Sequence, residues 1–207
     1  IAFRIALDQS SRDTFIRYTN PQFTAHDFDL NWKNQQARAK LLWQPTGTDL
    51  SALLTYSYSK AKRPNSEMAS EPYAKFQNLS LYQDNQQVSH QAGMLELDYE
   101  FANDIKLHHL LQYSDGVFDY HFAAPYQGLA KRDNENMSSD LRLEINKTAA
   151  EFSGVAGLFY WKDQTRNWLN NTFGTADADL GHTSAAPYAE LNWRMLPDWT
   201  LSTGLRY

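Results

Sequence analysis

The chain has 207 residues, of which 42% are hydrophobic and 21% charged, with a formal net charge of −5 and no cysteine. This composition excludes a disordered chain, disulfides and thiolate metal sites, and the absence of a basic run argues against nucleic-acid binding. No stretch of about eighteen apolar residues predicts a transmembrane helix, but a membrane β-barrel remains compatible with low hydropathy, because only alternate residues of its strands meet lipid.

Hydrophobicity alternates with period two along most of the chain, which predicts β-strands. The first strand is expected over residues 1–18, with an irregular part near residues 10–13. After a polar stretch, strands over 35–44 and 50–60 flank the turn sequence PTGTD, in which proline ends one strand and glycine accepts a positive φ. A long polar loop is expected over residues 61–87.

The second half repeats this alternation. The expected strands are residues 88–101, 105–122, 136–146, 151–163, 185–195 and 199–207. The expected short turns are AND (102–104), KTAA (147–150) and LPD (196–198). The expected long loops are residues 123–135 and 164–182.

About nine strands in this order predict an all-β fold, an antiparallel up-and-down meander. The expected connections alternate between long and short along the chain. Outer-membrane barrels sort their connections in this way, with short periplasmic turns and long extracellular loops. A soluble sandwich rarely does, so the pattern favours part of a large outer-membrane β-barrel over a soluble antiparallel sheet.

The charged residues of the strands fall on one face. The residues concerned are Glu96, Asp98, Glu100, Arg142, Glu144, Glu190, Arg194 and Arg206. A charge on a lipid-facing position costs about 2–4 kcal/mol at mid-membrane, whereas a charge on a wet lumen wall costs little. The charged face is therefore expected to line a lumen, and the apolar face to meet lipid.

Aromatic residues gather towards both ends of the predicted strands. Beside the short turns lie Trp43, Tyr99, Phe101, Trp193 and Trp199, and towards the loops lie Tyr56, Tyr58, Tyr113, Phe159 and Trp161. Two aromatic bands around an aliphatic belt are favoured by the two interfaces of a bilayer.

No nucleophile elbow, phosphate-binding loop or HExxH motif occurs, so no catalytic residue is assigned. His108 and His109 are adjacent and point to opposite faces of a strand, so they are not expected to chelate one metal together. The sequence DADLGH, residues 177–182, lacks the spacing of a calcium loop and is expected to be solvated loop. Asp119 and His121 only loosely suggest an outer-membrane hydrolase.

Aromatic residues of the expected loops are candidates for ligand contact or for packing the loops on each other, and packing is favoured. They are Tyr73, Phe76, Tyr82, Tyr126, Trp168 and Phe173. The ligand-binding residues therefore stay unknown, and no metal site or cofactor is expected.

Several stretches resemble barrel hairpins of TonB-dependent outer-membrane receptors. They are FRIALDQSSRDTFIRY, ARAKLLWQPTGTDLSALLTYSYS, SSDLRLEI, VAGLFYWKDQT and YAELNWRMLPDWTLSTGLRY. The resemblance implies a 22-stranded barrel plugged by an N-terminal domain, which takes up a scarce small-molecule ligand such as a metal chelate or iron-siderophore. It also implies the outer membrane of a Gram-negative bacterium, contact with membrane lipid, and energy from the TonB system.

Residues 1–207 are expected to be a partial barrel domain, with the plug, the signal peptide and the remaining strands outside this segment. An isolated segment of about nine strands is expected to form an open curved sheet, or to pair with copies of itself through its edge strands. The alternatives are another outer-membrane barrel, either a passive porin or an enzyme, and a soluble β-sheet binding module.

Overall fold

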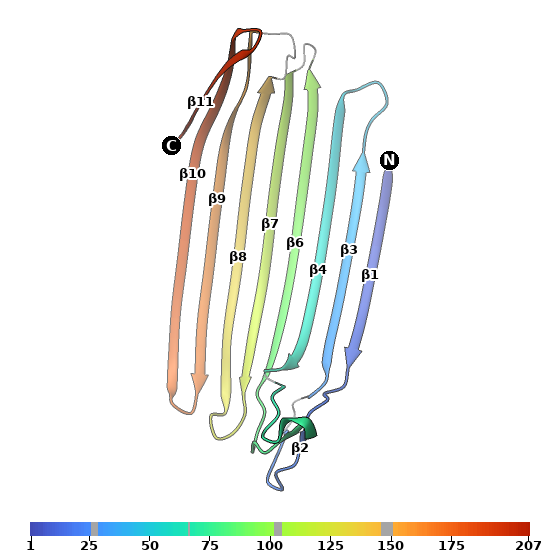
Figure 1. Ribbon diagram of the computed structural model, residues 1–207, viewed down its shortest axis with the longest axis vertical. Coiled ribbons are helices and arrows are strands. Elements are labelled where there is room, and N and C mark those ends of the chain that lie inside the picture. The colour runs from blue at the N-terminus through green and yellow to red at the C-terminus, as the bar shows by residue number, and fades with distance from the viewer. Residues whose placement is uncertain (26–28, 66, 102–104, 146–150) are drawn as a thin grey trace.

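The computed structural model describes residues 1–25, 29–65, 67–101, 105–145 and 151–207. Its elements follow one another as long strands with one short 3₁₀ helix (Figure 1). They are β1 (Ala2–Arg12), β2 (Arg17–Tyr18), β3 (Trp32–Trp43), β4 (Leu50–Pro64), η1 (Tyr73–Lys75), β5 (Gln77–Asn78), β6 (Asn85–Phe101), β7 (Ile105–Phe122), β8 (Gly128–Ile145), β9 (Phe152–Asn171), β10 (Gly174–Leu196) and β11 (Trp199–Arg206).

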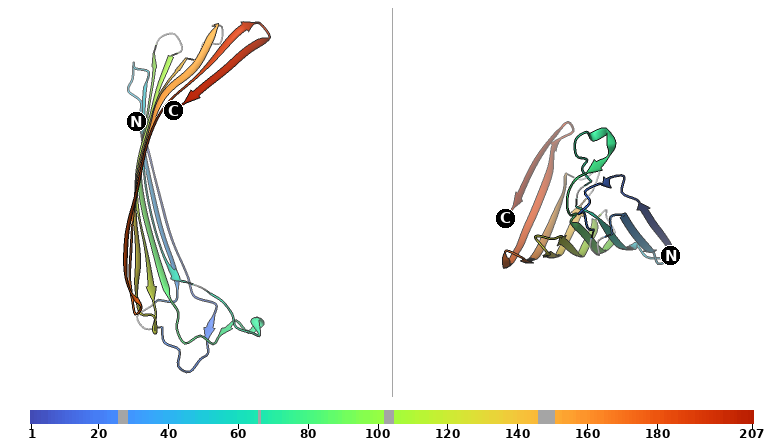
Figure 2. Two further views of the ribbon diagram at one scale, coloured as in Figure 1. Left: turned by 90° about the vertical axis from the view of Figure 1, so that its left-hand side faces the viewer. Right: turned by 90° about the horizontal axis from the view of Figure 1, so that it is seen from below.

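The long strands form one sheet of nine in the order β1-β3-β4-β6-β7-β8-β9-β10-β11, and each neighbouring pair is antiparallel. The predicted all-β up-and-down meander is confirmed. β2 and β5 pair in parallel as a separate two-stranded sheet. The large sheet is strongly curved and does not close, since β1 and β11 lie at its two edges (Figure 2).

The sheet has two faces of different chemistry, fixed by residues that lie directly opposite each other on successive strands. One row runs through Phe3, Leu41, Leu54, Leu95 and Leu111, and this face is named the apolar face. The next row runs through Arg4, Lys40, Thr55, Met94 and Gln112, and this face is named the polar face. All eight charged residues predicted to share one face lie in phase with the polar face.

Almost no apolar side chain is buried. Within the described residues only Ile16, Ala123 and Ala186 are buried hydrophobic residues. On the apolar face, Leu54, Leu141, Leu158 and Leu191 are 41–50% exposed. A monomeric soluble protein rarely leaves so continuous an apolar surface in water, so this face is built to contact an apolar medium or another surface.

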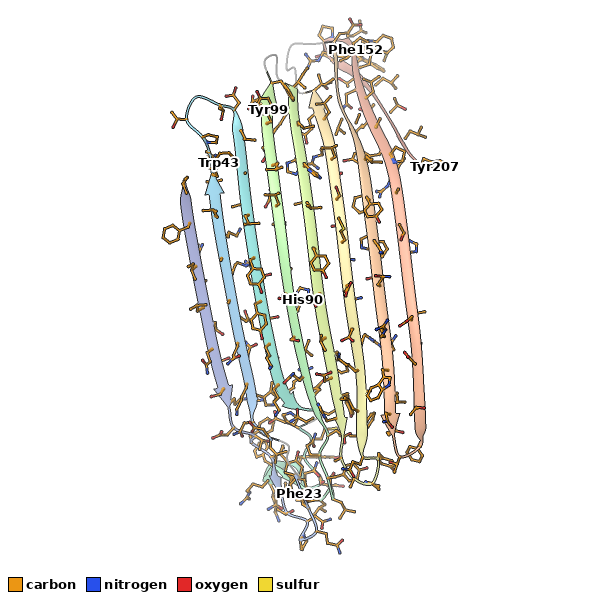
Figure 3. The ribbon with its side chains drawn as sticks, turned by 180° about the vertical axis from the view of Figure 1, so that it is seen from behind. Phe23, Trp43, His90, Tyr99, Phe152 and Tyr207 are labelled. Carbon is orange, nitrogen blue, oxygen red and sulfur yellow. The ribbon has the colours of Figure 1, made fainter. Side chains whose placement is uncertain are left out.

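Aromatic residues of the apolar face gather at the short-turn end of the sheet, as expected. Tyr99 and Phe101 pack edge to face with ring centroids 4.7 Å apart, and Phe152 stacks on Trp193 at 5.9 Å. Trp43, Tyr99 and Phe152 all lie towards this end of the molecule (Figure 3).

The second predicted aromatic band needs a correction. Leu141 lies opposite Leu158, and Asp140 lies opposite Phe159. Phe159 and Trp161 therefore share the polar face with Asp140, and Tyr160 is the aromatic residue that β9 places on the apolar face. The prediction was wrong because residues 155–161 have the sequence VAGLFYW, which places apolar residues on both faces. Alternation of hydrophobicity therefore does not reveal which of these side chains lie on which face.

Two of the three long loops expected from residue 61 onward are also wrong. The expected loop over residues 164–182 is strand, because β9 and β10 run to Asn171 and Gly174 and leave only residues 172–173 between them. The expected loop over residues 123–135 shrinks to residues 123–127. The expected loop over 61–87 is retained as residues 65–84, which include η1 and β5.

The strand lengths explain the missed segments. β7 and β8 have 18 residues, β9 has 20 and β10 has 23, whereas about 9–11 residues of tilted strand cross a bilayer. Most of the extra residues are polar, so the hydrophobic alternation by which the sequence marks a strand is weak there. Pairing with neighbouring strands satisfies their backbone groups regardless of side-chain pattern.

The turn over residues 45–49 forms as predicted, since Gly47 has a φ of +78° and the Thr48 hydroxyl donates to the Pro45 carbonyl at 3.1 Å. Residues 197–198 form the other described turn at this end. The predicted turns at 102–104 and 147–150 lie outside the described residues. No helix in the part of the chain that the structure describes is long and apolar enough to cross a membrane.

Candidate functional site

The polar face is the concave face of the sheet. The segments that carry β2, β5 and η1 gather over the hollow of the curve, as the view along the long axis makes visible (Figure 2). They contact polar-face residues, since Tyr120 donates to Asp84 at 2.8 Å and Arg12 pairs with Glu67. The polar face, including the segments above it, is therefore the surface on which a site for a polar ligand is sought.

A network of charges occupies the polar face near the short-turn end. Asp98 on β6 lies 2.8 Å from His108 Nδ1 and 3.1 Å from Lys106 Nζ, both on β7. Asp98, His108 and Arg142 lie opposite one another across three strands. These polar groups are partly buried in the wall and bind one another, so they stiffen this part of the sheet.

The network continues onto the later strands. Arg142 Nε lies 2.9 Å from Glu144 Oε1, and the Tyr188 hydroxyl donates to Asp140 Oδ1 at 2.7 Å. A hollow of about 300 Å³ lies here, lined by Arg142, Glu144, Tyr188 and Glu190 among others. The charges make this hollow suited to a polar surface or to water and unsuited to a lipid chain.

At the loop end, two arginines flank one tryptophan. The Arg12 guanidinium lies 4.9 Å from the ring centroid of Trp32, and the Arg63 guanidinium lies 5.1 Å from it. β1, β3 and β4 place these residues opposite one another on the polar face. The indole nitrogen of Trp32 is buried and has no hydrogen-bond partner within the described residues. Stacked arginines beside an indole can contact a ligand that is anionic or aromatic.

Glu67, in the segment above β4, limits the free charge of this cluster. Its side chain is only 7% exposed and pairs with Arg12. Burial, together with the nearby Glu67 carboxylate, raises the pKa of Tyr18, whose hydroxyl donates to Gln83 at 2.8 Å. The cluster therefore has one arginine compensated by Glu67, while Arg63 has no ion-pair partner among the described residues.

A second feature of the loop end is a row of aromatic rings along β7. Phe118, Tyr120 and Phe122 alternate on the polar face, and the rings of Tyr120 and Phe122 lie 4.7 Å apart. Beside them is a hollow of about 350 Å³, lined by Phe118, Phe122, Leu169 and Arg132 among others. It offers an apolar contact surface with a cation at its side, a combination common in small-molecule sites.

The two histidines singled out in the sequence lie on opposite faces, as expected. His108 contacts Asp98 on the polar face, whereas His109 Nε2 lies 3.0 Å from Ser139 Oγ on the apolar face. They do not form a joint site. Within the described residues, no group of three or more His, Asp or Glu side chains is arranged to hold a metal ion.

The other polar motifs from the sequence also lie in strands. Residues 177–182, expected as loop, belong to β10, and this expectation is wrong. Asp119 and His121 lie near the end of β7, on the face opposite that of Tyr120.

Most candidate loop aromatics pack against other rings. Phe76 packs edge to face on Phe15 at 6.0 Å, Tyr82 on Tyr126 at 6.0 Å, and Tyr126 lies 5.4 Å from Phe173. Packing was the favoured interpretation for these residues. Trp168 lies within β9 and not in a loop.

The arginine–tryptophan cluster and the aromatic row were missed by the sequence analysis. A signal for the row was present, because VFDYHF (117–122) places three aromatic rings at period two in phase with the polar face. No comparable signal marks the cluster, since Arg12, Trp32, Arg63 and Glu67 are brought together by strand register and by the fold of the segment above β4.

Comparison with known proteins places this geometry in context. No family model matches the sequence, and no curated protein matches it. Among solved structures, the ferric yersiniabactin uptake receptor FyuA from Yersinia pestis matches with a TM-score of 0.77 and 11% identity, over 99% of this chain and 33% of that chain. The siderophore receptor PiuA from Acinetobacter baumannii matches with a TM-score of 0.65 and 15% identity, over 99% of this chain and 38% of that chain.

The chain thus spans little more than a third of the length of these receptors. At such low identities the likeness concerns the fold, and it extends over nearly the whole chain. It agrees with the resemblance of the sequence to TonB-dependent receptors. The nine-stranded sheet has the fold of a wall segment from the β-barrel of a siderophore receptor.

Proposed function

We propose that this chain forms part of the barrel wall of a TonB-dependent receptor in the outer membrane of a Gram-negative bacterium. In this role the apolar face meets membrane lipid and the polar face lines the lumen. The observation that carries the proposal is that one sheet has an exposed aliphatic face and a charged, concave face. The fold of this sheet matches that of a siderophore receptor over 99% of the chain.

The ligand that we propose is a scarce small molecule such as an iron-siderophore. The loop end of the polar face supports this, because Arg12, Trp32 and Arg63 form a cation–aromatic cluster there and Phe118 and Phe122 line a hollow. Both features suit a bulky ligand that carries negative charge and unsaturated rings. The role is transport, and it requires no catalytic residue from this wall.

The short-turn end of the polar face supports the plugged barrel implied by the resemblance. Its charges around Asp98, Arg142 and Glu190 line a polar hollow, which suits contact with a folded domain inside the barrel. We propose that such a domain, elsewhere in the full-length protein, fills the lumen and couples the receptor to the TonB system.

The test is uptake by cells that carry or lack the gene of the full-length protein. Growth of the deletion strain on defined iron, cobalamin and glycan sources identifies the nutrient class, and uptake of the labelled compound is then measured. The proposal predicts uptake that requires the gene, TonB and the proton-motive force. Passage that continues without proton-motive force would instead identify a passive porin, and a protein found outside the outer-membrane fraction would exclude both.

A further inference from the structure

Along β4, the side chains of the apolar face change character in an ordered way. Leu50, Ala52 and Leu54 are followed by Tyr56 and Tyr58. Lys60 and Lys62 come next in the same phase, and Lys33 on β3 lies directly opposite Lys62. The row therefore passes from aliphatic to tyrosine to lysine on one face of one strand.

This order corresponds to depth in a bilayer. From Leu50 to Lys60 the strand rises about 33 Å, at roughly 3.3 Å per residue. A tilt of about 40° reduces this to about 25 Å, which is the height of the apolar band of an outer-membrane barrel. Leu50 lies opposite Tyr99 in the aromatic band at the short-turn end. Lys60 and Lys62 then lie just beyond the opposite apolar boundary, at the level of lipid headgroups.

The three lysines differ in how their charge is compensated. Lys33 Nζ forms an ion pair with the Asp29 carboxylate, which also lies close enough to Lys62 to interact with it electrostatically. Lys60 and Lys62 form no ion pair within the described residues. The patch of Lys33, Lys60 and Lys62, named the lysine patch, therefore has a net positive charge even with Asp29 ionised.

On the later strands, the residues of the apolar face that align with the lysine patch have their positive charges compensated by carboxylates. Lys60 and Lys62 align through Ser89 and Gln87 with Val117 and Asp119, and further along with Asp133 and Lys131. There Lys131 pairs with Asp133 at 3.0 Å, and Arg166 pairs with Asp179 at 3.0 Å. The cations of β8 and β9 in this register are thus neutralised within the protein, whereas those of β4 are directed outward at the lipid boundary.

We propose that the lysine patch binds the phosphate of a lipid headgroup in the membrane leaflet at the loop end. Lys60 and Lys62 are two residues apart on one strand and Lys33 is directly across from Lys62, so their ammonium groups can approach one phosphate together. Tyr56 and Tyr58, immediately below, provide amphipathic contacts for the glycerol or sugar region. This inference rests on the proposed membrane location.

The experiment uses the full-length protein in detergent micelles, with diphosphorylated lipid A as the probe and dephosphorylated lipid A as its matched control. The test variant is K60Q/K62Q, which keeps a polar side chain one atom shorter than lysine and removes the unpaired charges. The control variant is K131Q/R166Q, which removes two cations of the same face that are already ion-paired. Resistance of each purified variant to unfolding in sodium dodecyl sulphate checks that the barrel is intact.

We expect K60Q/K62Q to bind diphosphorylated lipid A about thirty-fold more weakly than the wild type, at about fivefold for each lysine near the headgroup layer. K131Q/R166Q should bind like the wild type, and dephosphorylated lipid A should bind weakly to all three proteins. Wild-type affinity in K60Q/K62Q, or equal losses in both variants, would overturn the proposal.

Two further outcomes separate this inference from its alternatives. Displacement of the lipid by inorganic phosphate at an equal concentration would show an anion site without lipid specificity and would overturn the lipid assignment. Fractionation of the cells tests the location independently. A protein absent from the outer membrane contradicts the proposed function, whereas an outer-membrane protein in which K60Q/K62Q binds normally contradicts only the lysine patch.

Discussion

The Tyr188 hydroxyl on β10 donates a hydrogen bond to Asp140 on β8 at 2.7 Å, across the intervening strand β9. Gly157 makes this reach possible. A Cβ atom at that position would lie 2.4 Å from Tyr188 Cζ, a distance that side chains do not tolerate. The ring therefore lies over the glycine, and one hydrogen bond links the two strands on either side of β9.

Replacing Gly157 by alanine should break the hydrogen bond between Tyr188 and Asp140. The Tyr188 ring must swing away from β9, and Asp140 loses its donor, so we expect the free energy of unfolding to fall by about 1–3 kcal/mol. Tyr188→Phe should cost about 1 kcal/mol through the same hydrogen bond. The double variant should then lose less than the sum of the two, and urea titration of the full-length protein in lipid vesicles measures all three.

The matched control for this prediction is Gly93→Ala on β6. A Cβ at Gly93 meets no atom within 4 Å, so this variant should keep or slightly increase stability. Equal losses in Gly93→Ala and Gly157→Ala would show that glycine removal itself, and not the contact with Tyr188, is responsible.

The assignment of the two faces predicts opposite responses at adjacent residues. Leu111 lies in the apolar row and Gln112 in the polar row of β7. Arginine at position 111 faces lipid and should cost about 2–4 kcal/mol, whereas arginine at position 112 faces the lumen and should cost less than about 1 kcal/mol. Unfolding titrations in vesicles decide this, and similar costs at both positions would contradict the lipid assignment.

The strands and their order could be predicted because one face of the sheet is apolar and the other polar over much of its length, which gives the strands a two-residue period. The predicted bounds of β7 agree with the structure, although from Phe118 onward its aromatic residues lie on the polar face. The period is weak where most residues of both faces are polar, and the ends of β9 and β10 were therefore predicted as loop. Their pairing, seen at Asn171 and Gly174, depends on backbone hydrogen bonds that leave no hydrophobic pattern in the sequence.

The candidate site could be predicted less well than the fold. In the sequence, Trp32 lies 20 positions after Arg12, and Glu67 lies 55 positions after it. Only the strand register and the fold of the segment above the sheet bring these three residues together. Such contacts depend on long-range geometry. The lysine patch was missed for a related reason, since Lys62 falls in the expected loop over 61–87 and Lys33 precedes the expected strand over 35–44, and only the register of β3 and β4 brings them together.

The corrected phase of β9 gives a direct test with fluorescent labels. Leu158 lies on the apolar face and Phe159 on the polar face. The chain contains no cysteine, so single cysteines at these positions can be labelled selectively within it. In vesicles of brominated lipid, a label at position 158 should be quenched several-fold more than one at position 159. Stronger quenching at position 159 would instead support the original prediction, in which Phe159 lies on the apolar face.

The ion pair between Asp29 and Lys33 predicts a local dependence on pH. The hydrogen bond from Lys33 holds the pKa of Asp29 below its ordinary value of 3.8. Because the pKa in the folded protein is lowered, the stabilisation is present above pH 3.8 and is lost as the pH falls through the lowered value. For a pair this accessible to solvent the effect is at most about 1 kcal/mol. Hydrogen exchange near residue 33 should increase only in that acidic range, and Asp29→Asn should abolish the dependence.

The pair between Arg12 and Glu67 should hold the segment above β4 onto the sheet. The Glu67 side chain is 7% exposed, so Arg12→Ala leaves a buried carboxylate without its cation and should destabilise the local fold by about 1–3 kcal/mol. Hydrogen exchange and limited proteolysis of residues 67–84 should then increase. Arg12→Ala combined with Glu67→Gln removes the uncompensated charge and should recover most of the protection. If the single and double variants open equally, the contact of Arg12 with the Trp32 ring, and not its charge, holds this segment in place.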